Sequence, residues 1–433
     1  MLDCQTILYD LAFQIDELCR HIYQVPQKLN ERDRVSDTPD LFTVLEGDKP
    51  WADKDWGLAL TAAQRLFNPS SPIDEERLFS GRITQVNDLL SVVYERGAHA
   101  ILYGERGVGK SSLANTITAR IPPAVTNIKI LKENCRPEDT FFTLWSKILF
   151  DFSYDGSLVA DYLKDESRDF MVIKILESLP KNLQYVFVFD EFDRITNMAT
   201  KTAIADTIKH FSDYPQNITI VVVGVGFSIE ELFGAHPSIQ RCCRQVPIQR
   251  MSKPELSEII TDRYPRIGIT ASQKIISDLI DLSRGLPGYA HLAGREAALS
   301  ALRNNRRVVE AVDYTAAISE SVRRAQESII TAYNRAVYSA KENIYKEVLL
   351  ACATAKTDDQ GLFAAADIRE ELIKILGRRV EIASFSRHLA RFCEPDRGPV
   401  LRKSGKKNRF QYQFVDAPLQ PYIFMSGRKD NLI

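Results

Sequence analysis

The chain has 433 residues, of which 45% are hydrophobic, so it is long enough for two or three domains and too apolar to be disordered throughout. Its net charge of −1 does not indicate which kind of partner it binds, so only local clusters of charge can do so. Seven cysteines without a CxxC pair argue against a disulfide framework and a structural zinc site. No signal-peptide pattern and no apolar run near the ~18 residues of a membrane span occur. We therefore expect a cytoplasmic protein with no membrane partner.

Residues 1–75 are predicted to form an N-terminal helix followed by an acidic, loop-rich extension. Apolar residues recur at helical spacing over about the first 30 residues, and the stretch up to Pro72 is rich in turn formers and charge. The first 72 residues hold 7 basic and 12 acidic side chains. This extension is a candidate surface for a protein partner. Trp51 and Trp56 either anchor it on the body of the protein by packing, or belong to such a surface.

The next three segments differ in their periodicity. Over residues 76–251, continuous apolar runs alternate with amphipathic stretches, which indicates a parallel sheet covered by helices on both faces. Residues 252–340 show helical patterns only. Residues 341–433 read as three helices followed by two strands that "GKKN" joins. The apolar runs that predict strands in the second segment are "HAILYG", "YVFVFD", "ITIVVVGVG" and "VPIQRM".

A glycine-rich stretch between an apolar strand and an amphipathic helix matches the phosphate-binding P-loop pattern G-x-x-x-x-G-K-[ST]. Glycines let successive N–H groups point into one concavity, and the helix that follows directs its positive dipole end at the same phosphates. Lys110 would reach the β- and γ-phosphates, and Ser111 would hold Mg²⁺. The alternative is an ordinary glycine-rich turn. The residues expected to bind nucleotide here are Gly104, Glu105, Arg106, Gly107, Val108, Gly109, Lys110, Ser111 and Ser112.

The strand "YVFVFD" ends in two carboxylates, Asp190 and Glu191. Asp190 is placed to hold Mg²⁺ through water, together with Ser111, and Glu191 to polarise the attacking water. A strand-ending acidic pair that caps the next helix is the structural alternative. The catalytic assignment to Lys110, Asp190 and Glu191 depends on the P-loop upstream.

The P-loop, the "DEFDRI" segment, the following apolar strand and the helical region together resemble an AAA+ ATPase. "LFSGR" is similar to the segment that crosses the adenine in the origin-recognition and initiator-type clade, which implies an adenine contact for Phe79, Gly81 and Arg82. The C-terminal pattern resembles that clade's winged-helix domain. The resemblance implies an α/β fold with a P-loop parallel-sheet ATPase core, a helical lid and a C-terminal winged-helix domain, and ATP or ADP with Mg²⁺ as ligands.

The same resemblance points to four further positions. Arg241 and Arg244 lie where such ATPases carry an arginine finger, which implies a homo-oligomer in the ATP state; both could equally be surface arginines at a helix end. Gly288 occupies the place of the usual sensor arginine, with His291 one turn later. The "GLP" trio that ends in Pro287 resembles the motif of STAND signalling ATPases, whose proline packs near the nucleotide. This departure implies a slow, switch-like ATPase, unless the trio is only a turn.

Positive charge gathers near the C-terminus: between Leu372 and Arg409, eleven lysines and arginines face three acidic residues, a net charge of +8. "EIASFSRHLARF" is a candidate recognition helix and "RKSGKKNR" the tip of a basic wing, a combination that docks on duplex DNA in helix-turn-helix relatives. A protein-binding module or a merely solvated hairpin is the alternative. The candidate DNA contacts are Arg387, Arg391, Arg402, Lys403, Lys406, Lys407 and Arg409.

Three functions follow from these observations. The first is an AAA+ ATPase that binds and hydrolyses ATP, assembles with nucleotide and acts on duplex DNA in a replication-initiator-like, transposition or anti-phage defence role. The second is a STAND-like, nucleotide-controlled signalling switch that acts on a protein partner or effector. The third is a scaffold with an inactive P-loop, which the intact Lys110, Ser111, Asp190 and Glu191 disfavour.

Overall fold

A computed structural model describes residues 50–69, 81–121, 127–163, 169–234, 237–339, 343–358, 360–405 and 409–433. The helix expected over the first 30 residues, as well as Phe79, Lys406 and Lys407, lie outside these ranges. Within them, no helix combines the length and the apolar character that a membrane span requires.

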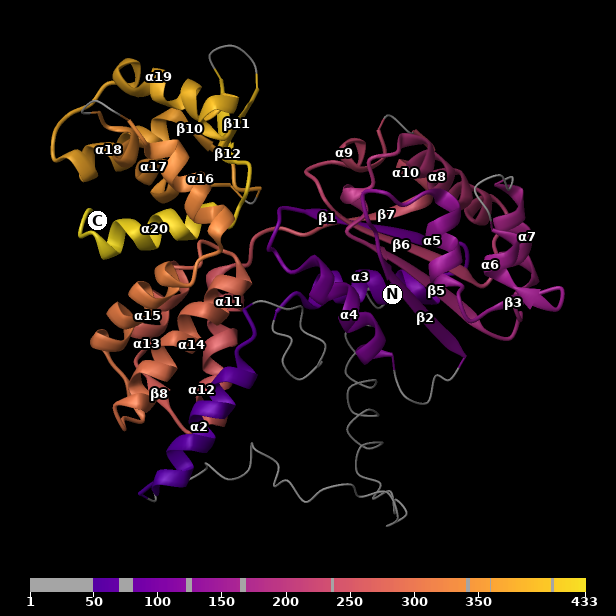
Figure 1. Cartoon of the computed structure of the whole chain (residues 1–433), viewed down its shortest axis with the longest axis horizontal. Helices are drawn as coiled ribbons and strands as arrows, with labels where there is room; N and C mark the ends of the chain where they lie inside the picture. The colour runs from indigo at the N-terminus through magenta and orange to yellow at the C-terminus, as the bar shows by residue number, and fades with distance from the viewer. Residues whose placement is uncertain are drawn as a thin grey trace, which may run out of the picture. The chain divides into compact units, whose positions relative to one another are not determined.

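A five-stranded parallel sheet forms the centre of the predicted α/β core (Figure 1). The α/β prediction is confirmed. The predicted strand at 246–251 is shifted, because β7 spans Cys243–Pro247. The edge strand β2 was not predicted, since charged and apolar residues alternate along it. In spatial order the strands are β2 (Ile128–Asn134), β5 (Gln184–Asp190), β6 (Ile218–Val225), β1 (His99–Gly104) and β7.

Alternate residues of the buried strands supply two separate cores, one on each face of the sheet. On one face, the ring of Trp145 lies 5.2 Å from those of Phe187 and Phe189. On the other face, Val188 and Val221 pack with Leu113. The first face is covered by α5 (Phe141–Ile148), α7 (Phe170–Ser178), α8 (Met198–Asp213), α9 (Ile229–Phe233) and α10 (Pro237–Cys242), and the second by α3 (Ile83–Tyr94) and α4 (Lys110–Arg120).

Short elements connect these strands and helices. A two-stranded hairpin and a one-turn helix stand between α5 and α7, and a 3₁₀ helix follows β5 directly. Their bounds are β3 (Ser153–Tyr154), β4 (Ser157–Leu158), α6 (Val159–Tyr162) and η2 (Phe192–Arg194).

The lid is helical, as predicted, apart from one short parallel strand pair. Buried apolar side chains of α11, α14 and α15 line the contacts between neighbouring lid helices. The elements are α11 (Lys253–Thr261), α12 (Arg263–Ile267), β8 (Thr270–Ala271), α13 (Gln273–Asp281), α14 (Pro287–Arg303), β9 (Val308–Val309) and α15 (Ala311–Arg323).

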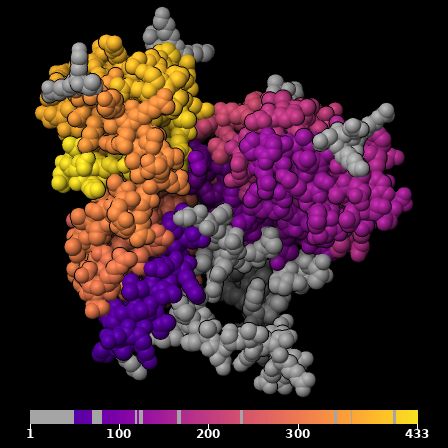
Figure 2. Space-filling model, in the orientation of Figure 1, coloured from indigo at the N-terminus to yellow at the C-terminus, as the bar shows by residue number. Residues whose placement is uncertain are grey.

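One further helix, α2 (Asp53–Leu66), lies along the lid (Figure 2). The expectation of a loop over this stretch is wrong. The buried face of α2 is made largely of alanines, so its apolar periodicity is weak in the sequence. Beyond its end, the ring of Phe67 lies 5.8 Å from that of Tyr264, and Arg263 donates a hydrogen bond of 2.9 Å to the Leu66 carbonyl.

Trp51 and Trp56, at the start of α2, pack within the structure. Their rings meet edge to face at 4.7 Å, and the guanidinium of Arg307 in the lid lies 4.7 Å from the ring of Trp51. The packing interpretation of these two tryptophans therefore accounts for both side chains.

The C-terminal module (residues 327–433) has a core of its own. The three predicted helices and the strand pair are present. The module also contains α16, from the segment 252–340 that was expected to be the lid, and a third short strand, a 3₁₀ helix and a last helix, which were not predicted. The sheet is antiparallel in the order β10–β12–β11. The elements are α16 (Glu327–Val337), α17 (Tyr345–Thr354), β10 (Phe363–Ala364), α18 (Ala365–Leu376), α19 (Ile382–Phe392), η3 (Pro395–Arg397), β11 (Leu401–Ser404), β12 (Gln411–Phe414) and α20 (Leu419–Lys429).

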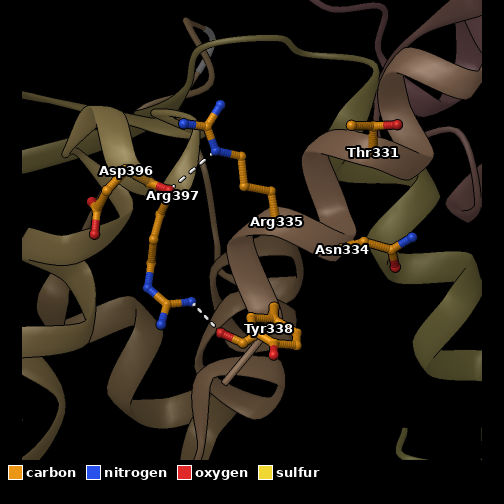
Figure 3. Close-up of a pocket in the computed structure, with 6 residues that line it drawn as sticks. All are labelled: Thr331, Asn334, Arg335, Tyr338, Asp396 and Arg397. Carbon is orange, nitrogen blue, oxygen red and sulfur yellow. Dashed lines mark hydrogen bonds between the residues drawn. The ribbon is translucent and has the colours of Figure 1, made fainter. Parts of the chain in front are cut away.

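A cavity of about 590 Å³ lies between α16 and η3 in this module (Figure 3). Arg335 donates a hydrogen bond of 3.1 Å to the Asp396 carbonyl, and Arg397 one of 3.0 Å to the Tyr338 carbonyl. The Arg397 guanidinium also lies 3.6 Å from the ring of Tyr345. Arg397, one of the eleven basic residues counted above, is thus part of the internal packing.

Candidate functional site

The P-loop joins β1 to α4 with the geometry that the sequence predicts. Helix α4 begins at Lys110, and its N-cap, Gly109, has a φ of 96° that favours glycine. Gly104 is required for a different reason: a Cβ atom there would lie 2.1 Å from the Ile248 carbonyl oxygen. The loop therefore passes close under the segment that follows β7.

A cleft of about 840 Å³ opens over this loop. It gathers residues from the core, the lid, the segment after α2 and the C-terminal module. Of the predicted residues, Arg106, Gly107, Gly109, Lys110, Ser111, Ser112, Asp190, Glu191, Pro287 and His291 line it. It is also lined by Asn68, Pro69, Asp193, Arg194, Gly224, Val225, Gly288, Val415 and Asp416, which were not predicted to bind nucleotide.

Lys110 is buried at the floor of the cleft. Its ammonium donates hydrogen bonds of 2.7 Å to the Glu105 carbonyl and 3.1 Å to the Gly104 carbonyl. Burial lowers its pKa to about 8, against the opposing effect of the nearby Asp193 and Asp190 carboxylates. A phosphate group in the cleft would compete for this ammonium and favour its charged form.

Ser111 and Asp190 meet at one end of the cleft, as predicted. The Ser111 hydroxyl lies 3.2 Å from Asp190 Oδ1, which also accepts a 2.8 Å hydrogen bond from the Glu191 N–H. A hydroxyl beside a buried carboxylate is a donor set that suits Mg²⁺, a hard cation that keeps several waters and takes one or two protein oxygens. These two residues therefore fit the predicted metal side of the site.

Two cations of the chain lie beside the two carboxylates that were predicted to be catalytic. Lys132 Nζ on β2 lies 2.8 Å from Asp190 Oδ2, and Arg194 Nη1 lies 2.6 Å from Glu191 Oε2. Lys132 was not predicted to take part in the site, because an alternating edge strand gives no local signal for it. Asp193, assigned no role from the sequence, accepts a 2.7 Å hydrogen bond from the Val225 N–H and so ties η2 to the end of β6.

The side chain of Glu105 does not line the cleft. It is 5% exposed, and its two oxygens accept hydrogen bonds of 2.7 Å each, from Arg250 Nε and from Gln413 Nε2. Gln413 belongs to β12 and is fully buried. Arg250 Nη1 also donates to Gln420 Oε1 at 2.5 Å. We call Glu105, Arg250, Gln413 and Gln420 the Glu105 cluster; it joins the P-loop to the C-terminal module.

The predicted adenine side lies next to the P-loop. Arg82 is buried, and its Nη2 donates to the carbonyls of Val108, at 3.0 Å, and Gln249, at 2.5 Å. Burial lowers the pKa of Arg82. The Gly81 N–H donates to Glu258 in the lid. Neither residue lines the cleft as described, and Phe79 lies outside the described residues.

The lid contributes two predicted residues. Pro287 begins α14, and its Cγ atom lies 3.7 Å from the Cβ position of Gly109, so it packs over the P-loop. His291 is 3% exposed, and its Nδ1 atom has no hydrogen-bond partner in the described structure. Burial, followed by the charges of Arg263 and Arg295, lowers its pKa to about 3, so this side chain is neutral at physiological pH.

The candidate arginine fingers lie on the surface of the core, away from the cleft of their own chain. Arg241 is 3.4 Å from Asp213, and Arg244 is 3.1 Å from Asp88. Ser228, in the segment that follows β6, accepts a hydrogen bond from the Glu231 N–H and so caps α9.

The candidate DNA residues divide into two groups. Arg387, Lys403 and Arg409 are exposed. Arg391 pairs with Glu394 at 2.9 Å and with Asp396. Arg402 is bound to the core, because its guanidinium lies 3.8 Å from the ring of Phe227 and 3.2 Å from Glu231 Oε1.

Residues 72–394 match the family model described as novel STAND NTPase 1, which covers most of the chain. The chain belongs to this family. The P-loop, the acidic strand end and the proline that begins α14 all lie within the matched region of this STAND NTPase.

Similarity to named proteins supports the same fold. An ORC1-type DNA replication protein of Thermoplasma volcanium is 22% identical over 157 residues, which span 34% of this chain and only 37% of that protein. The Aeropyrum pernix ORC2 protein, solved in ADPNP and ADP complexes, has a TM-score of 0.52 at 14% identity, over 85% of this chain and 97% of that one. A Walker-type ATPase of Pyrococcus abyssi has a TM-score of 0.51 at 17% identity, over 83% and 99%. This STAND NTPase thus shares the fold of these two solved structures.

Proposed function

We propose that this protein is a nucleotide-controlled switch, which binds ATP with Mg²⁺, hydrolyses it slowly and couples the nucleotide to the position of its C-terminal module. Membership of a STAND NTPase family supports this proposal. We take the C-terminal module to be a winged helix, on the strength of its three helices and three-stranded antiparallel sheet. In the conformation described here it is docked on the nucleotide cleft.

The Glu105 cluster is the observation that carries this proposal. A buried carboxylate of the P-loop is bonded to a buried amide of β12. Immediately after that strand, Val415 and Asp416 line the cleft itself, and Asp416 lies 3.6 Å from Arg106. A ligand that moves the P-loop backbone must therefore disturb the contact with the module. If the module moved away, Arg250 would still hold Glu105 Oε2, but the buried Oε1 would lose its donor, which is costly and favours the docked state.

The chemistry assigned to the cleft follows from its residues. Lys110 and the P-loop amides would bind the β- and γ-phosphates, and Ser111 and Asp190 would hold Mg²⁺, which neutralises phosphate charge. Glu191 would orient and polarise the attacking water. Arg194 holds one of the two Glu191 oxygens, Oε2, in an exposed ion pair and leaves the other for the water.

Hydrogen exchange tests this proposal on the whole chain. With ADP, we expect the amides of 411–416 to be protected. With Mg-ATP held unhydrolysed by Glu191→Gln, we expect their exchange to rise at least severalfold. Lys110→Ala, which removes the phosphate contact, should show no difference between the two nucleotides. Equal protection in the two nucleotide states, with both nucleotides bound, would contradict the switch.

A second candidate function is nucleotide-dependent action on duplex DNA by an assembled oligomer. The exposed face of α19, which carries Arg387, and the exposed Lys403 and Arg409 favour it. Lys406 and Lys407, which lie outside the described residues, would add positive charge to the same stretch of sequence. Arg241 and Arg244 on the core surface would act on a neighbour's nucleotide in the ATP state, and residues 1–75 would engage a protein partner.

Binding of duplex DNA at two salt concentrations tests this second candidate. We expect affinity to fall steeply with salt, and to be lost in a Lys403→Glu/Arg409→Glu variant but kept in Lys429→Glu, a lysine at the end of α20. No binding at low salt with either nucleotide would exclude it.

A further inference from the structure

Asp190 already has a cation of this chain beside it. Its side chain is 4% exposed, and Lys132 Nζ lies 2.8 Å from its Oδ2 atom. The other oxygen, Oδ1, accepts hydrogen bonds from the Ser111 hydroxyl and the Glu191 N–H. Both oxygens of this buried carboxylate are therefore engaged by groups of the protein itself.

The ammonium of Lys132 is held from two sides. Besides Asp190, it contacts Asn115 Oδ1 on α4 at 2.6 Å. Lys132 stands on β2 in register with Val188, two residues before Asp190 on the neighbouring strand. Exposed ion pairs contribute little, but a cation beside a buried carboxylate compensates a charge that would otherwise be costly. The contact therefore differs from a chance pair between two surface side chains.

A divalent cation at Ser111 and Asp190 would share this carboxylate with the ammonium. Charges of the same sign that lie a few ångströms apart around a buried group repel each other far more than they do in water. Each cation therefore weakens the hold of the other. Because the Lys132 ammonium already compensates the charge of Asp190, less of this compensation has to come from a metal ion.

We infer that Lys132 is a resident counter-ion of Asp190, which lowers the affinity of the site for Mg²⁺ and lets a nucleoside diphosphate bind with little dependence on the divalent cation. This inference rests on the proposed function in taking Ser111 and Asp190 as the metal side of the site. Lys132 acts through Asp190 and is a positioning residue.

The test uses Mn²⁺ as the probe, on the full-length protein with saturating ADP. Bound Mn²⁺ is measured from the loss of the electron paramagnetic resonance signal of the free ion. We expect Mn²⁺ to bind about tenfold tighter or more in Lys132→Met and Lys132→Gln, because one positive charge is removed from the carboxylate. The matched control is Lys129→Met on the same strand, whose ammonium lies over the ring of Phe152 and which should leave Mn²⁺ affinity unchanged.

A second readout is the dissociation constant of ADP with Mg²⁺ and with excess chelator. In the wild type, the chelator should raise the dissociation constant of ADP only a few-fold. In the Lys132 variants, this ratio should be about ten times larger. Gln can still donate a hydrogen bond to Asp190, so Lys132→Gln is the variant expected to keep the fold, checked by its thermal unfolding midpoint.

Two results would overturn the inference, and they are distinguishable. If the wild type binds ADP while both Lys132 variants bind Mn²⁺ no tighter than it does, Lys132 is not a counter-ion and the proposed function stands. If the wild type binds ADP neither with Mg²⁺ nor with chelator, the proposed function is wrong and the inference falls with it.

Discussion

The ammonium of Lys110 loses its proton at a pH that ordinary buffers cover. Burial lowers its pKa to about 8. Phosphate oxygens bind the charged form of Lys110. The affinity for ADP should therefore be close to its maximum at pH 7 and decline as the pH rises through 8 towards 9.5. An unperturbed lysine would keep its charge to about pH 10.

Calorimetry at several pH values, in buffers with different ionisation enthalpies, measures this effect. Above pH 8, binding of ADP should take up a proton, because the phosphates restore the charge of Lys110. Lys110→Ala should bind weakly and without this uptake. If the affinity of the wild type for ADP is constant up to pH 9.5, the ammonium of Lys110 keeps its charge before ADP binds, and the prediction is wrong.

At the scale of elements, α2 belongs to the lid. Phe67 is fully buried against Tyr264 and His291, and Arg263 donates to the last residue of the helix. Phe67→Ala should lower the free energy of unfolding by about 3–5 kcal/mol, because it leaves a cavity at this junction.

Urea unfolding followed by tryptophan fluorescence would report this loss, since Trp51 and Trp56 stand at the start of α2. Thr61→Ala, an exposed position on the same helix, should change stability by no more than about 0.5 kcal/mol. Equal stabilities of the Phe67 and Thr61 variants would mean that α2 does not share the cooperative unit of the lid.

The same elements explain how far the sequence could predict the structure. Strands β1, β5 and β6 are buried on both faces and therefore appear as continuous apolar runs. Strand β2, at the sheet edge, alternates and was missed, and α2 was missed because alanines make its buried face.

Of the site, the P-loop and the acidic strand end could be predicted, since each is a local pattern. The partners that complete them could not. Gln413 is 308 positions from Glu105 and Arg250 is 145. Lys132 reaches Asp190 from a neighbouring strand. Such contacts depend on how distant segments of the chain pack against each other, and the local periodicity of the sequence does not predict them.

At the scale of the whole molecule, Gln413 is one of the residues that hold the C-terminal module against the P-loop. Gln413→Leu removes the donor to Glu105 Oε1 and leaves a buried carboxylate oxygen without it, which should weaken docking by roughly 1–3 kcal/mol. Release of bound ADP should then accelerate about tenfold, the effect of ~1.4 kcal/mol.

Stopped-flow displacement of a fluorescent ADP analogue measures that rate. The matched control is Gln411→Leu, which lies on the same strand with its side chain exposed and should leave the rate unchanged. The prediction fails if Gln413→Leu releases ADP as slowly as the wild type while its fold is intact.

The guanidinium of Arg402 is already bound by residues of the core. Its guanidinium is stacked on Phe227 and paired with Glu231, yet it stands on the strand that a polyanion would approach. Any partner that recruits this side chain has to compete with the protein's own surface for it. Arg402 also donates a hydrogen bond of 3.1 Å to Gln413. By thermodynamic linkage, a competitor for Arg402 that weakens docking would itself bind less tightly, by the same factor, to the nucleotide state in which the module is docked.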